Sequence, residues 1–495
     1  MKVKRILPVV LLGGLLLGCR RIPQPMEKSW VADFPQLGTN SSPRCADLNG
    51  DGVLDVVLGA GRNEFEACEH GVIALDGRTG ALLWSHPAED QVVGSALFLD
   101  VTADSIPDVF IGGRKAQLFA LDGATGQELW HYEVLSEEYG TLGLMRFNFY
   151  NPQTLPDQDG DGLPDLLVAN GGNVLAAAGS TEQRFPGVLA VFSSRSGALL
   201  AADTMPDRRE TYMSPLVADL DADGTLDLLF GTGGETIGGS LFRATLDELL
   251  NNDLSKARPL LTRTGHGFIA PPALTDLNGD QTLDIVGNWH GGMTYAIDGR
   301  SHELLWSVEL PDAEASNSLA LGFFSPDTVP DVFTFFSLGT WPENRAAVQL
   351  MLDGRDGRVL LQDTLGCSGF FSPVALDLEN DGRDEVLLGV NAYPCRRYDF
   401  ERVRYHLELF DFRRGIHYPF TPELPAKNVS STPWVGDLDG DHYLDIIHCP
   451  QVPTPRMDGF FGFQVQRISS NVKIESPPRW GAYMGPGGRG VFLFQ

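Results

Sequence analysis

The chain has 495 residues, with 65 acidic against 37 basic side chains and a formal net charge of −28 at pH 7. Such an acidic protein would be repelled by nucleic acids and by anionic lipids, so neither is expected as a partner. Many of the carboxylates lie in short, repeated loops, which indicates a local role for their charge.

The first eighteen residues predict a bacterial export signal. Lys2, Lys4 and Arg5 form a basic start, and an apolar run of twelve residues extends from Ile6 to Leu17. This run is too short to cross a membrane as a helix, which favours a signal peptide. No later stretch of the sequence is long and apolar enough to span a bilayer.

The segment Leu16-Leu17-Gly18-Cys19 resembles the lipobox of bacterial lipoproteins. This resemblance implies cleavage before Cys19, lipidation of its thiol, and an exported chain anchored in the cell envelope. Arg20 stands where an Asp retains many lipoproteins in the inner membrane, so outer-membrane placement is implied. Residues 19–28 would then form a short tether. The alternative is an ordinary signal peptide with an incidental cysteine.

One acidic loop organises the rest of the sequence. Asp219, Asp221, Asp223 and Asp227 occupy its positions 1, 3, 5 and 9, with Gly224 at position 6. Ca²⁺ takes about six to eight oxygen ligands, and a tight turn can supply most of them from one short segment. The glycine permits the positive φ that such a turn requires. An apolar run follows the last carboxylate, so we expect a strand after the loop.

The same ligand pattern recurs along the chain, which favours metal loops over ordinary solvated turns. Five further complete copies are Asp47, Asn49, Asp51 and Asp55; Asp157, Asp159, Asp161 and Asp165; Asp276, Asn278, Asp280 and Asp284; Asp377, Glu379, Asp381 and Glu385; and Asp437, Asp439, Asp441 and Asp445. A weakened copy holds Asp100, Asp104 and Asp108, and the copy at 323–331 has lost its first two carboxylates. We expect about six structural Ca²⁺ sites, whose loss would weaken the fold. The alternative is a series of acidic turns without metal.

The spacing of the loops predicts the fold. They begin at residues 47, 100, 157, 219, 276, 323, 377 and 437, a period typical of a propeller or solenoid. In each unit a short strand enters the loop, an apolar strand leaves it, and a hairpin follows, most clearly at 72–84, 118–130, 294–306 and 349–361. We therefore predict an all-β, eight-bladed β-propeller of four-stranded antiparallel blades, as a single domain over residues 29–495.

The two ends of the chain predict how the ring closes. Residues 29–32 match the fourth strand of a blade, and residues 490–495 have the pattern of a third strand. We expect the N-terminal strand to complete the last blade, which leaves no open sheet edge.

These features carry a family resemblance over nearly the whole mature chain. The acidic loop with its apolar strand resembles the FG-GAP/VCBS repeats of integrin-type propellers. The hairpins at 74–84 and 120–130, with the pattern Ala-x-Asp-x-x-Thr-Gly-x-x-x-Trp, resemble the tryptophan-docking motif of quinoprotein-like propellers. Both resemblances imply blade architecture and neither implies an activity. The adjacent-cysteine pair associated with quinone binding is absent from the sequence, so a quinone cofactor is not expected.

Five cysteines follow Cys19, an odd number for an oxidising compartment. Their spacing does not fix the pairing and does not match a zinc site. Cys367 and Cys395 flank one repeat and are the favoured pair. Cys68 and Cys449 lie in the first and last repeats and could join the two ends.

Ligand binding is expected on the face of the ring opposite the acidic loops. In a four-stranded blade, the loops between the first and second strands share a face with the turns between the third and fourth. The remaining loops share the opposite face, and they are the longest in this sequence. Binding residues usually lie on such loops, and Trp, Tyr and Arg dominate binding energy. The candidates are Arg146, Tyr150, Trp289, His290, Trp341, Arg396, Arg397 and Tyr398. The alternative is that these loops only cover the blades.

The sequence contains no nucleophile elbow, zinc-protease motif or phosphate-binding glycine loop, so no enzyme is indicated. We expect a calcium-stabilised, membrane-anchored propeller that acts as a binding or scaffold module in the bacterial cell envelope, with a protein or glycan ligand. A polysaccharide lyase-like enzyme is one alternative, because one lyase family also has Ca²⁺-bearing blades. It would place Lys, Arg, His or Tyr residues in the axial cleft. The other alternative is a structural subunit of an outer-membrane complex, resembling the propeller lipoprotein of the barrel-assembly machinery.

Overall fold

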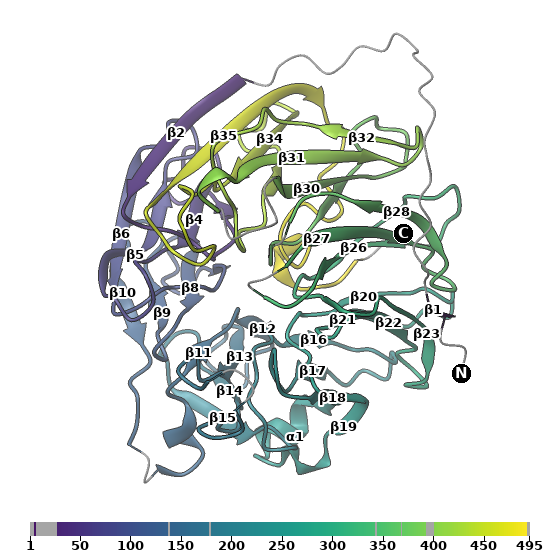
Figure 1. Ribbon diagram of the computed structural model, residues 1–495. Helices are drawn as coiled ribbons and strands as arrows, with labels where there is room; N and C mark the ends of the chain where they lie inside the picture. The colour runs from purple at the N-terminus through teal and green to yellow at the C-terminus, as the bar shows by residue number, and fades with distance from the viewer. Residues whose placement is uncertain are drawn as a thin grey trace.

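The computed structural model describes residues 4–5, 27–136, 139–177, 180–341, 344–367, 369–392 and 400–492. Figure 1 shows antiparallel sheets set side by side in a ring. Over the described residues there are eight sheets, each built on four antiparallel strands. The prediction of an all-β, eight-bladed propeller is therefore confirmed.

The blades are numbered in chain order, and their strands are given from the first to the fourth. Blade 1 holds β3 (Arg44–Ala46), β4 (Asp55–Gly59), β5 (Cys68–Leu75) and β6 (Leu82–Ala88). Blade 2 holds β7 (Leu97–Leu99), β8 (Asp108–Gly112), β9 (Leu118–Leu121) and β10 (Glu128–His131). Blade 3 holds β12 (Gln153–Leu155), β13 (Asp165–Gly171), β14 (Val188–Phe192) and β15 (Leu199–Thr204), and β11 (Asn148–Phe149) also pairs with β13. Blade 4 holds β16 (Leu216–Ala218), β17 (Asp227–Gly231), β18 (Gly239–Thr245) and β19 (Arg258–Arg263).

Blade 5 holds β20 (Ala273–Thr275), β21 (Asp284–Trp289), β22 (Met293–Ile297) and β23 (Leu304–Glu309), with the two-residue strand β1 (Lys4–Arg5) parallel to β23. Blade 6 holds β25 (Ala320–Gly322), β26 (Asp331–Leu338), β27 (Ala346–Leu352) and β28 (Val359–Thr364), and β24 (Ala313–Glu314) also pairs with β26. Blade 7 holds β29 (Val374–Leu376), β30 (Glu385–Ala392), β31 (Arg404–Asp411) and β32 (Ile416–Pro419). Blade 8 holds β33 (Trp434–Gly436), β34 (Tyr443–His448), β35 (Gly462–Lys473) and β2 (Glu27–Pro35).

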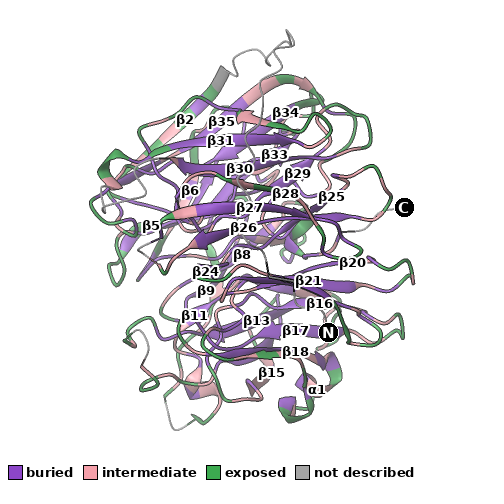
Figure 2. Ribbon diagram, turned by 45° about the vertical axis from the view of Figure 1, so that its right-hand side comes forward, coloured by how far each residue is buried: buried purple, intermediate pink, exposed green. Residues whose placement is uncertain are grey.

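The second strand of each blade forms from the apolar run that follows an acidic loop. In β4, β8 and β17 every residue is buried, because the blade is covered on both faces by its neighbours. A strand covered on both faces reads as a continuous apolar run. Figure 2 shows the buried colour along these strands and the exposed colour mainly in the connecting loops. The short helix α1 (Leu246–Leu250), with a capping box at Thr245 and Glu248, is inserted between β18 and β19.

The N-terminal strand closes the ring as predicted. β2 pairs antiparallel with β35 and becomes the outer strand of blade 8, so the first and last parts of the chain share one sheet. This pairing is visible in Figure 1, where the earliest long strand lies along the latest one.

The prediction for the C-terminus is wrong. The third strand of blade 8 is β35, and the segment after it, as far as residue 492, runs past the inner strands of several blades instead of forming that third strand; residues 493–495 lie outside the described residues. Trp480 bridges to Ala375 of blade 7 and Val491 to Leu274 of blade 5. Trp480 is fully buried, because this segment fills the space between the inner strands. Its apolar residues pack against the blades from inside the ring.

Tryptophan docking joins neighbouring blades along the chain order. The Nε1 of Trp84, on the fourth strand of blade 1, donates to the carbonyl of Gly123 in blade 2 at 2.8 Å. The Trp84 ring lies over Gly126, where a Cβ would sit only 2.6 Å from a ring carbon. Equivalent bonds run from Trp30 to Gly77, from Trp130 to Ser194 and from Trp306 to Gly354. The motif's Trp and Gly are thus the two halves of one contact between blades.

A belt of polar residues links the blades near the axis. The residue two positions before the first strand of most blades accepts a hydrogen bond, through its side-chain oxygen, from the backbone N–H of its counterpart in the preceding blade. The bonds run from Thr432 to Ser42, Ser42 to Ser95, Ser95 to Asn151, Asn151 to Ser214, Ser318 to Ser372 and Ser372 to Thr432, at 2.7–3.3 Å. Blade 5 has Pro271 at this position, which has no N–H and no side-chain oxygen.

The cysteines follow the sequence expectations only in part. Cys68 and Cys449 pack in the same apolar cluster at the junction of blades 8 and 1, but both are free thiols, so this possible link between the ends is not formed. Cys367 is disulfide-bonded. Its predicted partner Cys395 lies outside the described residues, as does Cys19. Among the described residues, no helix has the length and apolar character needed to cross a membrane.

Candidate metal loops and ligand cleft

Each acidic loop connects the first and second strands of its blade, on the face that carries the turns between the third and fourth strands. The position-9 carboxylate ties the two together. In blade 1, Asp55 accepts from the N–H of Leu48 within the loop and of Gly77 in the turn, both at 2.9 Å. Asp108 and Asp284 make the same pair of bonds in blades 2 and 5.

The position-1 carboxylate shapes the loop itself. Both oxygens of Asp47 accept backbone N–H groups, from Gly50 at 2.7 Å and Gly52 at 2.9 Å. Asp100, Asp157, Asp219, Asp276, Asp377 and Asp437 accept equivalent bonds in their loops. Gln281 and His442 replace the position-6 glycine and still take a positive φ, of 68° and 67°.

Three loops bring carboxylates close enough to share one cation. In blades 3, 4 and 8, one oxygen from each of three aspartates lies within 4.8 Å of the other two. The groups are Asp157, Asp159 and Asp165; Asp219, Asp221 and Asp223; and Asp437, Asp439 and Asp445. Clustered carboxylate oxygens are the ligands that Ca²⁺ prefers.

An arginine enters two of these three loops. In blade 4, Arg243 contacts Asp221 at 3.4 Å and Asp227 at 2.7 Å. In blade 8, Arg467 contacts Asp439 at 2.5 Å and Asp445 at 3.0 Å. Each guanidinium neutralises charge that a metal ion would otherwise balance.

The blade 3 loop keeps its carboxylates much freer of arginine. Arg195 only approaches Asp161, at 3.9 Å, and its own side chain is 54% exposed. Blade 3 is therefore the best candidate for a cation.

The remaining loops use other partners. In blades 1 and 5 the position-3 amides of Asn49 and Asn278 donate to Asp76 and Asp298 of the adjoining turns, at 3.3 and 2.8 Å. In the same loops Asp51 and Asp280 each accept a hydrogen bond from the backbone N–H two residues further on, at 2.9 Å. In blade 7, Glu379 pairs with Arg414 and Asp381 with Arg413. In blade 2, Asp104 accepts from Ile106. In the altered loop of blade 6, Asp327 lies 3.8 Å from Arg355.

Burial raises the pKa of the position-9 carboxyls. It does so to about 6 for Asp55, Asp165 and Asp284, and to about 8 for Glu385. Water is excluded where the loop meets the turn, which disfavours the charged form. A bound cation would favour the ionised form again, so metal binding at these loops should release protons.

The opposite face holds a cleft of about 500 Å³ at the axis, in the range of small-ligand sites. Its lining comes from loops between fourth and first strands and between second and third strands, as the sequence predicted for this face. Tyr483, from the C-terminal segment, also contributes. Uncharged hydrogen-bonding residues and aromatics make up much of the wall, including Asn40, Asn148, Asn151, Asn173, Tyr150, Tyr212, Trp341 and Phe370.

Two arginines in the wall are held by carboxylates. Arg114 pairs with Glu64 at 2.6 Å across blades 2 and 1. Arg184 pairs with Glu210 at 2.6 Å and donates to the Tyr212 hydroxyl at 3.1 Å. Arg114 Nη1 and Arg184 Nε are buried without a hydrogen-bond partner. Unsatisfied buried donors beside a cleft are groups that a bound ligand or water can satisfy.

The tyrosines and the histidine near the cleft are poorly suited to proton transfer at neutral pH. Burial raises the pKa of Tyr150 and of Tyr212 far above neutrality, so neither is an effective base. Burial lowers the pKa of His290 to about 3. Glu235 differs from them, because desolvation by the surrounding protein, followed by repulsion from Glu314, raises the pKa of its carboxyl toward neutrality.

The candidate ligand residues are spread over several environments. Tyr150 and Trp341 line the cleft, and Trp341 packs edge-on against Phe370. Arg146 donates to the carbonyl of its neighbour Gly143. Trp289 donates to the His266 carbonyl and lies under Arg263. His290 is buried and contacts Ser316. Arg396, Arg397 and Tyr398 lie outside the described residues.

The sequence analysis did not single out Arg114, Glu235 or Tyr212 as candidates. Arg114 follows the Gly112–Gly113 pair that ends β8, in a short loop without aromatic enrichment. Tyr212 lies four residues before β16, much as Tyr150 lies three before β12. Both tyrosines lie in the segment that leads into a first strand, and that segment is the signal in the sequence that points to them.

Comparisons with known proteins agree with the repeat and the fold. Residues 157–230, which include the acidic loops of blades 3 and 4, match the family model of the FG-GAP-like repeat. The chain is 28% identical over 385 residues to Protein FAM234B of Gallus gallus, covering 70% of this chain and 56% of that protein. The chain thus spans little more than half of this relative's length.

Solved propellers are similar in fold. A europium-containing methanol dehydrogenase matches with a TM-score of 0.56 at 12% identity, over 90% of this chain and 93% of that one. The exotype rhamnogalacturonan lyase YesX matches with a TM-score of 0.54 at 14% identity, over 92% of this chain and 76% of that one. At such identities the likeness concerns the fold alone. The FG-GAP-like repeats and the quinoprotein-like propeller fold are thus both confirmed.

Proposed function

We propose that this propeller recognises a ligand in its axial cleft and acts as a binding or scaffold module in the bacterial cell envelope. Calcium in the acidic loops would stabilise the scaffold, and a lipidated Cys19 would hold it at the membrane. The observation that carries the proposal is the cleft, where loops of several blades place hydrogen-bonding and aromatic side chains around about 500 Å³.

The wall chemistry favours a glycan over a flat protein surface. Asn and Tyr side chains offer both donors and acceptors, which suits a ligand rich in hydroxyl groups. Trp341 and Phe370 supply apolar faces. A concave cleft of this volume fits a small ligand or the end of a chain, whereas a protein interface buries a broader area.

A polysaccharide lyase remains the second candidate, because Arg114, Arg184, Tyr150 and Tyr212 converge at the cleft. The raised pKa of both tyrosines counts against it, since neither can supply a base near neutral pH. Incubation with uronate-containing polysaccharides tests this activity. Formation of unsaturated products would show that the protein is a lyase and not only a binding module.

Binding can be tested with a panel of cell-envelope glycans and with proteins captured from detergent-solubilised membranes. Trp341→Ala and Glu235→Gln should weaken capture about tenfold, a typical loss for a central contact. Glu303→Gln is the matched control, because Glu303 is exposed in a turn on the opposite face. Equal binding by all three variants would contradict a ligand site in the cleft.

The anchor has its own test. Cys19→Ser should release the protein from the membrane fraction or leave an unprocessed precursor, because the thiol would carry the lipid. Unchanged membrane partition together with normal processing would argue against lipidation.

A further inference from the structure

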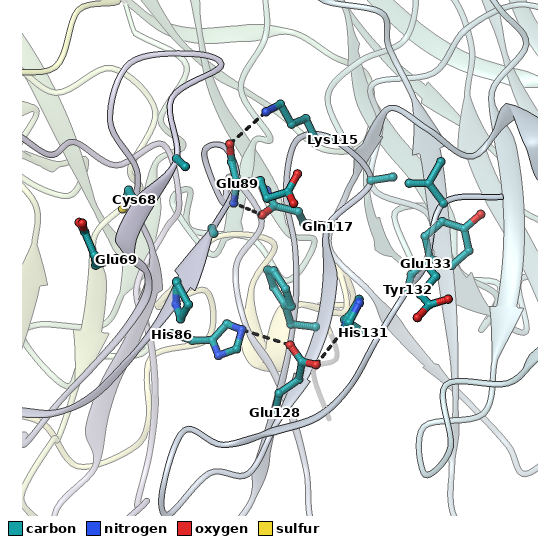
Figure 3. A pocket seen from close by; sticks show the side chains of 16 residues that line it. Cys68, Glu69, His86, Glu89, Lys115, Gln117, Glu128, His131, Tyr132 and Glu133 are labelled. Carbon is teal, nitrogen blue, oxygen red and sulfur yellow. Dashed lines mark hydrogen bonds and ion pairs between the residues drawn. The ribbon is translucent and has the colours of Figure 1, made fainter. Parts of the chain in front are cut away.

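A second pocket, separate from the axial cleft, lies at the outer rim between blades 1 and 2. Its volume is about 670 Å³. Figure 3 shows Glu128 between two histidines on its wall. His86 Nε2 lies 3.3 Å from one carboxylate oxygen, and His131 Nδ1 lies 2.6 Å from the other. The two imidazoles thus contact the same carboxylate from its two oxygens, at the edge of an open cavity.

The local backbone sets up this arrangement. His86 comes from β6 of blade 1, whereas Glu128 and His131 come from β10 of blade 2. The pairing of β10 with β9 shifts register between Glu128 and Trp130, a bulge that turns Glu128 to the same side as His131. The His86 ring also packs edge-on against Phe119 at 5.0 Å, which orients it toward the carboxylate.

Blade architecture does not require these residues. In the hairpins of blades 1, 3, 5 and 6, the register places Leu82, Leu199, Leu304 and Val359 where blade 2 has Glu128. Ser85, Ala202, Ser307 and Gln362 stand where it has His131. These four blades therefore fold without an acidic residue at the first position and without a histidine at the second, so the blade does not require this histidine–carboxylate set.

We infer that His86, Glu128 and His131 bind a divalent transition-metal ion, such as Zn²⁺, at the mouth of this pocket. Two imidazoles and one carboxylate form a ligand set that suits Zn²⁺ and leaves a position open for water or a ligand. The two imidazoles now contact different oxygens of Glu128, so binding one ion requires the side chains to turn until all three ligand atoms lie about 2.0–2.2 Å from the metal, with release of the protons shared in the present contacts. His131 is 46% exposed and Glu128 34% exposed, so both have room to turn.

The surroundings favour a cation. Glu69, Glu89 and Glu133 also line the pocket, against the single cationic side chain of Lys115. Lys115 donates to the Glu89 backbone carbonyl at 3.2 Å, and Figure 3 shows it apart from the histidines. The acidic loops, by contrast, offer only oxygen ligands, which suit Ca²⁺.

Zn²⁺ binding to the full mature chain, measured by titration calorimetry with excess Ca²⁺ present, tests the inference. The wild type should bind one Zn²⁺ at this site, and His86→Ala, His131→Ala and Glu128→Gln should each weaken that binding at least about tenfold. Thermal melting without Zn²⁺ should be nearly unchanged, since sibling blades fold without these residues. Co²⁺ bound in place of Zn²⁺ should show the visible absorption bands of a cobalt ion with nitrogen ligands. These bands should be absent from the two histidine variants.

His417→Ala is the matched control, because His417 belongs to another histidine–carboxylate cluster, with Glu408 and Asp363, at the junction of blades 6 and 7. It should leave the Zn²⁺ affinity unchanged. Equal loss in His417→Ala and His86→Ala would overturn the assignment to this pocket, as would a wild type that takes up no Zn²⁺.

Discussion

At the scale of single residues, the charged groups between blades act as pH-dependent contacts. His417 of β32 lies 2.6 Å from Glu408 of its own blade and 2.9 Å from Asp363 of blade 6. Its hydrogen bond to Glu408 raises the pKa of His417, and burial only partly opposes this. The two histidines beside Glu408 hold the pKa of that carboxyl below its usual value despite its burial.

We expect His417 to make stability fall above about pH 6.5. Because its pKa is higher in the folded than in the unfolded state, the folded protein binds more protons above that pH. The stabilisation is therefore complete below the unfolded pKa and is lost as the pH rises through the folded value. Urea unfolding of the wild type and of His417→Gln between pH 6 and 9 should show a steeper decline in the wild type than in the variant, since other groups such as Glu385 contribute equally to both. A parallel decline in both proteins would contradict this role.

At the scale of elements, the Trp–Gly contact determines how each hairpin meets the next blade. Gly126 has a φ of 70° beneath the Trp84 ring, whereas Gly415, in the corresponding turn of blade 7, has a φ of 62° with no atom near its Cβ position. Substituting each of the two glycines therefore separates the cost of backbone strain from the cost of losing the contact with the tryptophan ring.

We expect Gly415→Ala to cost about 1 kcal/mol, from the left-handed backbone alone. Gly126→Ala should cost about 2–4 kcal/mol, because the new methyl group also displaces Trp84 and breaks its bond to Gly123. Chemical denaturation of the two variants measures the difference. Equal costs would mean that the docked ring contributes little to the stability of the ring of blades.

Calcium binding belongs to the same scale, because each loop is a separate element. If the loops bind Ca²⁺, the blade 3 loop should bind more tightly than the blade 4 loop, where Arg243 already contacts Asp221 and Asp227. A site that is filled at a hundredfold excess over its dissociation constant adds about 2.7 kcal/mol of stability. Asp159→Asn should therefore remove more of the calcium-dependent rise in melting temperature than Asp221→Asn.

The matched variant Arg243→Met should increase the calcium response of blade 4, since it leaves the carboxylates without their neutralising partner. Melting temperatures with Ca²⁺ and with a chelator measure all three variants. If the chelator leaves the melting temperature of the wild type unchanged, calcium has no structural role in the loops.

The elements were predictable from sequence where local chemistry decides them. The sequence directly shows the recurring acidic loops, the apolar second strands and the Asp-Gly hairpins such as that at Asp76. The C-terminal segment was not predictable, because the apolar pair Val491–Phe492 fits the third strand of a blade as well as a segment inside the ring. The cleft was only partly predictable, since the pair of Arg184 and Glu210 joins loops of two blades and depends on the finished ring.

At the scale of the whole molecule, three devices hold the ring together. β2 closes blade 8, the C-terminal segment fills the axis, and the polar belt joins neighbouring blades. The bond from Thr432 to Ser42 continues the belt across the point where the chain ends meet, so closure does not depend on the outer strand alone. The belt is interrupted at Pro271 of blade 5, and the interruption affects Ser318, the residue at the same position in blade 6.

Ser318 and Ser372 occupy the same position in blades 6 and 7, and both are about 1% exposed. Ser372 accepts the N–H of Ser318 at 3.1 Å, whereas the Ser318 hydroxyl has no hydrogen-bond partner, because Pro271 offers no N–H. Ser372→Ala should therefore cost about 1–2 kcal/mol, by leaving the Ser318 N–H buried and unsatisfied. Ser318→Ala should cost less than about 0.5 kcal/mol, since it removes a hydroxyl that bonds nothing. Urea denaturation of both variants compares their free energies of unfolding. An equal loss of stability would mean that the hydrogen bonds of the belt do not help to hold the ring closed.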